Sequence, residues 1–301
     1  MDAMEIPVFC YHNAIAGGLE KDLAFLVANG YQTLTASEIV DVLTGVTDAP
    51  DKPVGLTFDD GLLSLKTVGL PLFERYDARA TIFVITGLTP EGRTEPGRSD
   101  DDFRLLGWDD LAALGASGRV ELGSHGHRHN PVHVDLRSGA TLKIGDHSRL
   151  YDVPVPFAEA CDADAIRAAD GTPTRPATPL FEADRIIVDG SIVEAAPYVA
   201  SDLERSIAAL RQRLGVERFH LCLPYGRGRD AMIERAREAG FASIFWSRRE
   251  DRAANRPGDD PYRIVRRKHD FLQRLPGSGR RSLLDVFFAK VKRRLTSDPW
   301  E

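Results

Sequence analysis

Two aspartates stand side by side in the stretch VGLTFDDG, residues 54–61, directly after a run of strand-forming residues. Adjacent carboxylates repel each other unless something positive lies between them. A hairpin turn is the plain alternative, but a second strand should then follow within two residues, whereas residues 62–76 have helical spacing. We therefore expect Asp59 and Asp60 to lie beside a cation.

The stretch HGHRH forms a second polar cluster, in which His125 and His129 are four residues apart. On a helical turn or in a tight loop, this spacing lets both imidazoles face the same point, while His127 is expected behind them or in solvent. Two imidazoles and one carboxylate suit a divalent ion such as zinc and leave one position for water, whose pKa the ion lowers to roughly 7. If Asp60 binds the ion, Asp59 is left to take the proton of that water.

Apolar runs of strand length alternate with segments of helical period along most of the chain. This order is typical of parallel strands joined by crossover helices, and about seven such units predict an α/β fold of the distorted (β/α)7-type barrel. The expected strands are 6–12, 54–58, 80–85, 120–125, 219–225, 242–246 and 262–267. The expected helices are 19–30, one capped by Thr35 and Glu38, 62–76, 108–118, 203–215 and 231–240.

In a parallel α/β barrel the carboxyl ends of all strands share one rim, where active sites are built. The aspartate pair and the histidine cluster each follow a predicted strand, and Tyr11-His12 and Pro224-Tyr225 end two others. These clusters should therefore meet on one surface. A solvated loop with adventitious metal affinity would explain HGHRH alone, but not its convergence with the aspartates. His12 is either a core histidine or a rim residue.

The segment from about 139 to 200 lacks the alternation of strand-like and helical segments. We interpret it as an inserted lid on a single barrel that covers residues 1–280. It contains a predicted hairpin, RIIVDGSIVEAAP, with Asp189-Gly190 as its two-residue turn. We expect the helix that follows to be capped by Ser201 and Glu204.

Residues 281–301 are predicted to form a basic amphipathic helix and tail. We expect this helix to pack on the barrel with its lysines and arginines in water, and docking on a membrane surface through residues 280–295 is the alternative. The apolar face consists of Leu283, Leu284, Phe287, Phe288 and Val291.

Composition limits the partners and the compartment. The chain of 301 residues has a net charge of −6, which argues against nucleic acid as a partner. Three cysteines without CxxC spacing fit a reducing compartment and argue against a thiolate zinc site. The first residues show no basic segment followed by a long apolar one, so we expect a cytoplasmic protein, with the inner membrane face as a variant of that location. The oligomeric state stays open.

The motifs resemble those of the polysaccharide deacetylase family, the NodB-homology or carbohydrate esterase 4 group. TFDDG resembles the first motif, GSHGHRH the H-x-x-x-H motif, LPYG the end of the third motif, and PVFCYH the opening strand of many bacterial members. The resemblance implies a barrel hydrolase that acts on carbon–nitrogen bonds and removes an acyl group from an N-acylated sugar with a metal ion.

Carried over to this chain, the resemblance implies that Asp59 is the general base and that Asp60, His125 and His129 bind the metal. Zn²⁺ is expected first, and Co²⁺, Ni²⁺ or Fe²⁺ would satisfy the same ligands. The backbone N–H of Tyr225 would help to stabilise the oxyanion.

The chain departs from the family pattern at Cys222, where the third motif has the arginine that orients the base. Arg263 is our first candidate to supply that cation from the last strand, and Arg266 is the second. The general acid of the family is a late histidine in an L-x-H context. The nearest candidate here is His269 in IVRRKHD, and His12 is its rival.

Three functions remain open at this point. The first is a metal-dependent deacetylase that hydrolyses the N-acetyl group of an amino sugar in a polysaccharide, oligosaccharide or lipid-linked saccharide. The second keeps the metal centre but acts on a non-sugar amide or imide, or on a formamido sugar. The third is a catalytically silent carbohydrate-binding homologue. We expect the saccharide to contact His12, Pro224 and Trp246.

Overall fold

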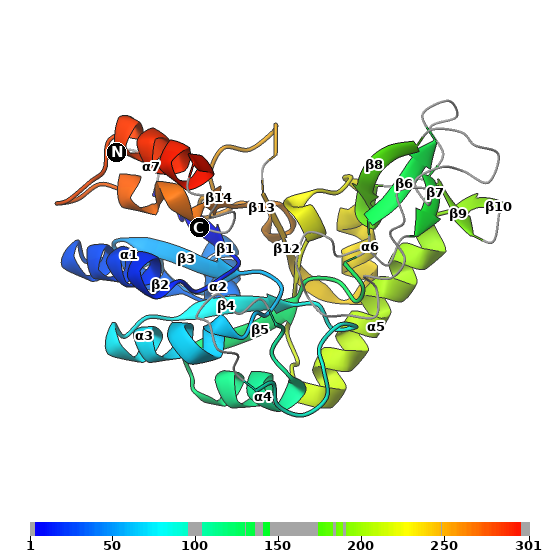
Figure 1. Cartoon of the computed structure of the whole chain (residues 1–301), viewed down its shortest axis with the longest axis horizontal. Coiled ribbons are helices and arrows are strands. Elements are labelled where there is room, and N and C mark those ends of the chain that lie inside the picture. The colour runs from blue at the N-terminus through cyan, green and yellow to red at the C-terminus, as the bar shows by residue number, and fades with distance from the viewer. Residues whose placement is uncertain are drawn as a thin grey trace.

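Parallel strands form a nearly closed barrel with helices on its outside (Figure 1). This computed structural model describes residues 4–95, 104–129, 131–135, 141–144, 174–182, 185–188, 191–247 and 249–295. Around the barrel the strands follow the order β13-β12-β11-β5-β4-β3-β1-β14, and β2 pairs with β3 beside this path. The predicted distorted (β/α)7-type barrel is confirmed.

The elements follow the predicted alternation closely. The strands of the barrel are β1 (Val8–Tyr11), β2 (Gln32–Leu34), β3 (Pro53–Phe58), β4 (Ala80–Val84), β5 (Val120–Ser124), β11 (Phe219–Cys222), β12 (Phe241–Trp246), β13 (Ile264–Val265) and β14 (Arg267–Lys268). The helices are α1 (Ala16–Ala28), α2 (Ala36–Leu43), α3 (Leu70–Arg75), α4 (Trp108–Ala116), α5 (Ala196–Leu214), α6 (Ala231–Ala239) and α7 (Leu283–Leu295).

Burial explains why the central strands read as continuous apolar runs. Every residue of β3 and β4 is buried, because side chains fill the inside of the barrel while helices cover its outside. The predicted cap of α2 is confirmed, since the Thr35 hydroxyl accepts from the Glu38 N–H and the Glu38 carboxylate accepts from the Thr35 N–H.

The last strand closes the barrel by changing partners partway along. Ile264 and Val265 pair with β12, whereas Arg267 and Lys268 pair with β1. The predicted strand 262–267 is therefore split into β13 and β14. Arg266 lies at the change of partner and is buried, while the residues that follow it are exposed.

The insertion begins earlier than predicted. The strands β6 (Pro131–Asp135), β7 (Thr141–Ile144) and β8 (Thr174–Pro179) form a small antiparallel sheet beside the barrel. The predicted hairpin is confirmed, because β9 (Arg185–Val188) pairs antiparallel with β10 (Ser191–Glu194). Its turn, Asp189-Gly190, lies outside the described residues.

The start of α5 corrects one prediction. The helix begins at Ala196, so Ser201 and Glu204 lie inside it and cap nothing. Pro197 occupies its first turn, a position that suits proline because its missing N–H would have no helical partner there.

The C-terminal helix α7 does not pack as expected. Val286 is buried, but the side chains of Leu283, Leu284, Phe287 and Phe288 are 60%, 66%, 59% and 64% exposed. The prediction that these four pack on the barrel is therefore wrong. Among the described residues, no helix is both long enough and apolar enough to span a bilayer.

Candidate active site

Three predicted ligands meet at the carboxyl ends of β3 and β5. Asp60 Oδ1 lies 3.5 Å from His125 Nε2 and 3.8 Å from His129 Nε2, and all three side chains are buried. Ligands about 2.0–2.2 Å from a zinc ion at tetrahedral angles lie about 3.3–3.6 Å from one another. These residues therefore fit a divalent metal ion with little movement.

Both histidines present the lone pair that a metal needs. His125 Nδ1 lies 2.9 Å from the carbonyl oxygen of Cys222, which can only accept a hydrogen bond, so Nδ1 carries the proton. Nε2 is then unprotonated, and its lone pair can bind a metal ion. Burial holds the pKa of His129 well below its usual value, and the neighbouring His125 lowers it further. His129 is therefore neutral at neutral pH, as a metal ligand must be.

The backbone around these ligands is unusual. Asp60, His129 and Tyr225 have φ values of 70°, 56° and 60°, in the left-handed region that side chains other than glycine seldom adopt. Such strained conformations cluster at functional sites, where surrounding contacts enforce them. The strain falls on two of the predicted ligands, Asp60 and His129, and on the predicted oxyanion donor, Tyr225.

The loop that carries the histidines is held by a helix that the sequence did not link to it. The Asp202 carboxylate on α5 accepts from the backbone N–H groups of His127 and Arg128, at 2.6 and 3.1 Å. Burial raises the pKa of Asp202 to about 6, although these two hydrogen bonds lower it. His127 turns away from the ligands as predicted, with Nδ1 at 3.1 Å from the Thr86 hydroxyl.

Asp59 lies beside the ligand group, and a buried arginine holds it there. Arg266 Nη1 and Nη2 lie 2.6 and 2.9 Å from the two carboxylate oxygens of Asp59. Burial by itself would raise the pKa of Asp59, but the guanidinium of Arg266, aided by His125, holds it well below its usual range. Asp59 is therefore ionised at neutral pH and fixed in orientation.

Two thiols complete the surroundings of Asp59. Cys10 Sγ lies 3.4 Å from Oδ2 and Cys222 Sγ lies 3.5 Å from Oδ1. Asp59, His125 and Cys222 could also be combined as metal ligands. We favour the group around Asp60, because Asp59 in the other group is already paired with Arg266 through both of its carboxylate oxygens. The guanidinium beside Asp59 would also repel an ion there.

The other predicted rim residues are also near the site. The Tyr225 ring packs on the His129 ring at 4.8 Å, in the turn Pro224–Gly226 that follows β11. His12 is exposed at the end of β1, and its charge lowers the pKa of both Asp59 and His129. His269 stacks on Tyr11 at 4.7 Å, and its Nδ1 lies 3.4 Å from the carbonyl of Cys10.

Three predicted roles need correction. Arg263 does not reach Asp59, because it pairs at the surface with Asp230 and Asp251 at 3.4 and 2.9 Å. Trp246 is only 2% exposed and donates its indole N–H to the Tyr262 carbonyl, so it is a core residue rather than a substrate contact. Pro224 is buried as well, and its role is to shape the turn before Tyr225.

Sequence reasoning ranked Arg266 second and missed Asp202. Four basic residues occur between 263 and 268, and only the change of strand partner decides which one points inward. Asp202 follows Ser201 in a segment whose pattern predicts only a helix start, so nothing in the sequence indicates that its carboxylate contacts the histidine loop.

Comparison with known proteins agrees with this geometry. The polysaccharide deacetylase family model matches residues 47–152, which include Asp59, Asp60, His125 and His129. YxkH of Bacillus subtilis (strain 168), named as a polysaccharide deacetylase of uncertain standing, is 34% identical over 89 residues, or 27% of this chain and 32% of that protein.

Two further relatives extend the comparison. The poly-β-1,6-N-acetyl-D-glucosamine N-deacetylase of Escherichia coli (strain K12) is 24% identical over 166 residues, or 50% of this chain and 24% of that protein. The matches thus span about a third or a quarter of the length of these curated relatives. The deacetylase domain of BpsB from Bordetella bronchiseptica has the same fold, with a TM-score of 0.64 at 21% identity over 89% of this chain and 96% of that one.

Fold and site together define a parallel α/β barrel with a two-histidine, one-carboxylate centre on its rim. Over residues 47–152 the chain is similar to polysaccharide deacetylases, and its fold is that of a solved deacetylase domain.

Proposed function

We propose that this protein is a metal-dependent hydrolase that removes the acetyl group from an N-acetylated amino sugar in a saccharide chain. The observation that carries the proposal is the division between two adjacent carboxylates. Asp60 faces His125 and His129, while Asp59 is turned to Arg266 beside them.

Asp60, His125 and His129 would hold the divalent ion. When bound, the ion supplies Lewis acidity that polarises the acetyl carbonyl and lowers the pKa of a water molecule. Asp59 Oδ2 lies 3.9 Å from His125 Nε2, so a water beside the ligand group is within its reach. Asp59 accepts the proton of the attacking water, and Arg266 keeps its carboxylate ionised and aimed.

The backbone N–H of Tyr225 is the donor that we assign to the developing oxyanion. The left-handed conformation at Tyr225 and the packing of its ring on His129 place this residue next to the ligand group. A fixed N–H in a buried site stabilises the charge that develops on the carbonyl oxygen, because it needs no reorientation during the reaction.

His12 is the group that we assign to protonate the leaving amine. Its exposed position directly after β1, close enough for its charge to lower the pKa of Asp59 and His129, supports this role. His269 is the alternative, and it lies at the end of the neighbouring strand β14.

The substrate class rests on the names of the relatives and on the place of the insertion. One relative is named for poly-β-1,6-N-acetyl-D-glucosamine, which supports an N-acetylglucosamine polymer as substrate. The insertion starts with β6, two residues after His129 and so next to the loop that carries the histidines, which supports a role for it in selecting the saccharide.

Acetate release tests this proposal. The protein is incubated with β-1,6-linked N-acetylglucosamine oligomers, with a formamido sugar and with a simple acetamide, each with and without a chelator. We expect acetate from the oligomers, loss of the activity with chelator, and recovery when Zn²⁺ is added back.

Two results would redirect the assignment. Release from the formamido sugar or the acetamide alone would keep the chemistry and change the substrate. Saccharide binding without release of any acid, in protein shown to contain metal, would identify a silent carbohydrate-binding homologue.

A further inference from the structure

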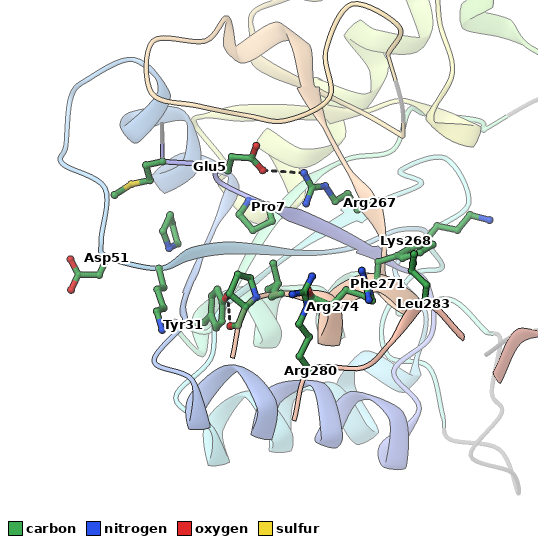
Figure 2. Close-up of a pocket in the computed structure, with 15 residues that line it drawn as sticks. Glu5, Pro7, Tyr31, Asp51, Arg267, Lys268, Phe271, Arg274, Arg280 and Leu283 are labelled. Atoms are coloured by element: carbon green, nitrogen blue, oxygen red, sulfur yellow. Dashed lines mark hydrogen bonds and ion pairs between the residues drawn. The ribbon is translucent and has the colours of Figure 1, made fainter. Parts of the chain in front are cut away.

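A hollow of about 900 Å³ opens on the outside of the barrel, beside the residues that precede β1 and β3 (Figure 2). Pro7, Tyr31 and Pro53 line it together with Phe271 and Leu283. The last of these begins α7, so the hollow is continuous with the exposed side of that helix.

The rim of this hollow is strongly cationic, and we call it the basic hollow. Its lining includes five basic side chains but only two acidic ones, Glu5 and Asp51. Glu5 is shared between Arg267, at 3.2 Å, and Arg256, which lies outside the hollow, at 2.9 Å. The five basic residues are Lys52, Arg267, Lys268, Arg274 and Arg280.

Backbone contacts fix two of these cations without cancelling their charge. Arg274 Nη1 donates to the carbonyl of Arg281, and Arg280 Nε donates to the carbonyl of Arg274. Carbonyl acceptors carry no net charge, so both guanidinium groups keep their positive charge. Figure 2 shows Arg274 and Arg280 close together on one side of the hollow.

Next to the basic hollow, α7 presents four large apolar side chains to solvent. We call Leu283, Leu284, Phe287 and Phe288 the α7 apolar face, and each of them is at least 59% exposed. They account for four of the seven large apolar side chains that are exposed among the described residues. Such a concentration within six residues marks an interaction surface rather than scattered exposure.

The helix that carries this face is firmly attached. Val286 is 3% exposed on its opposite side, and the Arg281 N–H donates to the carbonyl of Gln273 at 2.8 Å. Ser282 and Asp285 cap the helix start reciprocally, at 2.8 and 3.1 Å. The exposure of the α7 apolar face is therefore built into the fold.

We propose that the α7 apolar face and the basic hollow form a docking surface for an anionic lipid bilayer. The apolar side chains enter the boundary between headgroups and acyl chains, and the cations of the hollow meet lipid phosphates. This combination of a short apolar face with surrounding lysines and arginines is what interfacial binding requires.

The charge of this surface favours an anionic bilayer over a second copy of the chain as its partner. An isologous dimer through the same surface would bring two sets of these cations together, whereas an anionic bilayer complements them.

Part of the docking surface lies at the strand ends that are opposite the candidate active site. Pro7 and Pro53 lie at the starts of β1 and β3, whereas Asp60, His125 and His129 follow the ends of their strands. The Pro7 and Pro53 side of the basic hollow is therefore at the opposite strand ends from these three residues.

Co-sedimentation of the full chain with vesicles tests the proposal. One set of vesicles is pure phosphatidylcholine and the other contains phosphatidylglycerol. We expect binding to the anionic set that weakens as salt is added, because salt screens exposed charges. Phe287→Ser with Phe288→Ser should weaken binding by about tenfold or more, and so should Lys268→Glu with Arg280→Glu.

Matched control variants show whether a loss of vesicle binding comes from the changed surface rather than from a general effect of substitution. Phe287→Leu with Phe288→Leu keeps the apolar surface and should still bind, and Arg213→Glu reverses a charge on α5, away from the hollow, and should bind normally. Circular dichroism checks folding of every variant. The proposal would be overturned if the protein does not bind anionic vesicles. It would also be overturned if both weakening double variants bind them as well as the native protein does. A dimer in light scattering that Phe287→Ser with Phe288→Ser dissociates, while vesicles bind nothing, would overturn it as well.

Discussion

Arg266 donates to both carboxylate oxygens of Asp59 inside the barrel, at 2.6 and 2.9 Å, from the point between β13 and β14 where the chain changes strand partner. Position 222, where the sequence motif led us to expect an arginine, is a cysteine. The thiol of Cys222 also contacts Asp59. The cation beside Asp59 therefore comes from position 266, and position 222 contributes a thiol instead.

Arg266→Lys should fold and bind metal but lose turnover. Lysine keeps the charge but lacks the two parallel N–H donors, so Asp59 is no longer fixed. We expect turnover to fall by about 100-fold, the typical effect of a small misplacement in a catalytic group. Steady-state acetate release measures it.

The matched control for this change is Arg263→Lys, which alters a surface ion pair and should be near native. The exchange variant Cys222→Arg with Arg266→Cys returns the cation to the motif position, and we expect it to recover part of the activity. Native turnover in Arg266→Lys would contradict the positioning role.

His129→Ala should abolish metal binding, while His127→Ala should not. Loss of a hydrogen-bond partner of a ligand already costs about 10- to 100-fold in metal affinity, so loss of a ligand should exceed about 100-fold. Elemental analysis of the purified proteins and competition with a fluorescent chelator measure the difference. Equal metal content in the two variants would contradict the ligand group.

His12→Ala should lower turnover on N-acetylglucosamine oligomers by about 100-fold or more with metal retained, as removal of a general acid does. The loss should be smaller on acetanilide, whose weakly basic amine leaves with less need of a proton. His269→Ala is the comparison, and it should remain within about tenfold of native. The reverse order of the two effects would assign the proton donor to His269.

Glu121 gives the fold a predictable response to pH. Burial would raise its pKa, but hydrogen bonds from His220 and Ser37 lower it from 4.5 to about 2. A lowered pKa means that the ionised form stabilises the folded state. This stabilisation is complete above about 4.5 and is lost as the pH falls towards 2, and it corresponds to at most about 3 kcal/mol.

Glu121→Gln should therefore lower the free energy of unfolding at neutral pH, and the deficit should shrink below about pH 4.5. Urea unfolding at a series of pH values measures it. Glu20→Gln is the control, because Glu20 pairs with Arg75 at the surface and should contribute less than about 1 kcal/mol. A deficit that is constant with pH would contradict the assignment.

Much of the site could be predicted because its chemistry is local in the sequence. Asp59 and Asp60 follow one strand, and His125 and His129 lie in one short loop, so motif spacing and the barrel rim were enough to bring them together. The α2 cap was predictable for the same reason, since Thr35 and Glu38 interact across one helical turn.

The remaining features depend on contacts between distant segments. Whether Arg263 or Arg266 points inward depends on where the last strand leaves β12 and joins β1. Whether the apolar residues of α7 are covered depends on a neighbour that periodicity does not reveal. The start of α5 was misplaced because Ser201 and Glu204 imitate a cap, whereas Pro197 sets the true first turn.

The most direct test of the central claim is the measurement of metal content and acetate release together in Asp59→Asn. The account predicts a folded protein with its full complement of metal and a turnover reduced by about 100- to 10,000-fold, because the ligands remain and the proton acceptor is gone. Near-native turnover, or loss of the metal in a folded protein, would contradict the division of roles between Asp59 and Asp60.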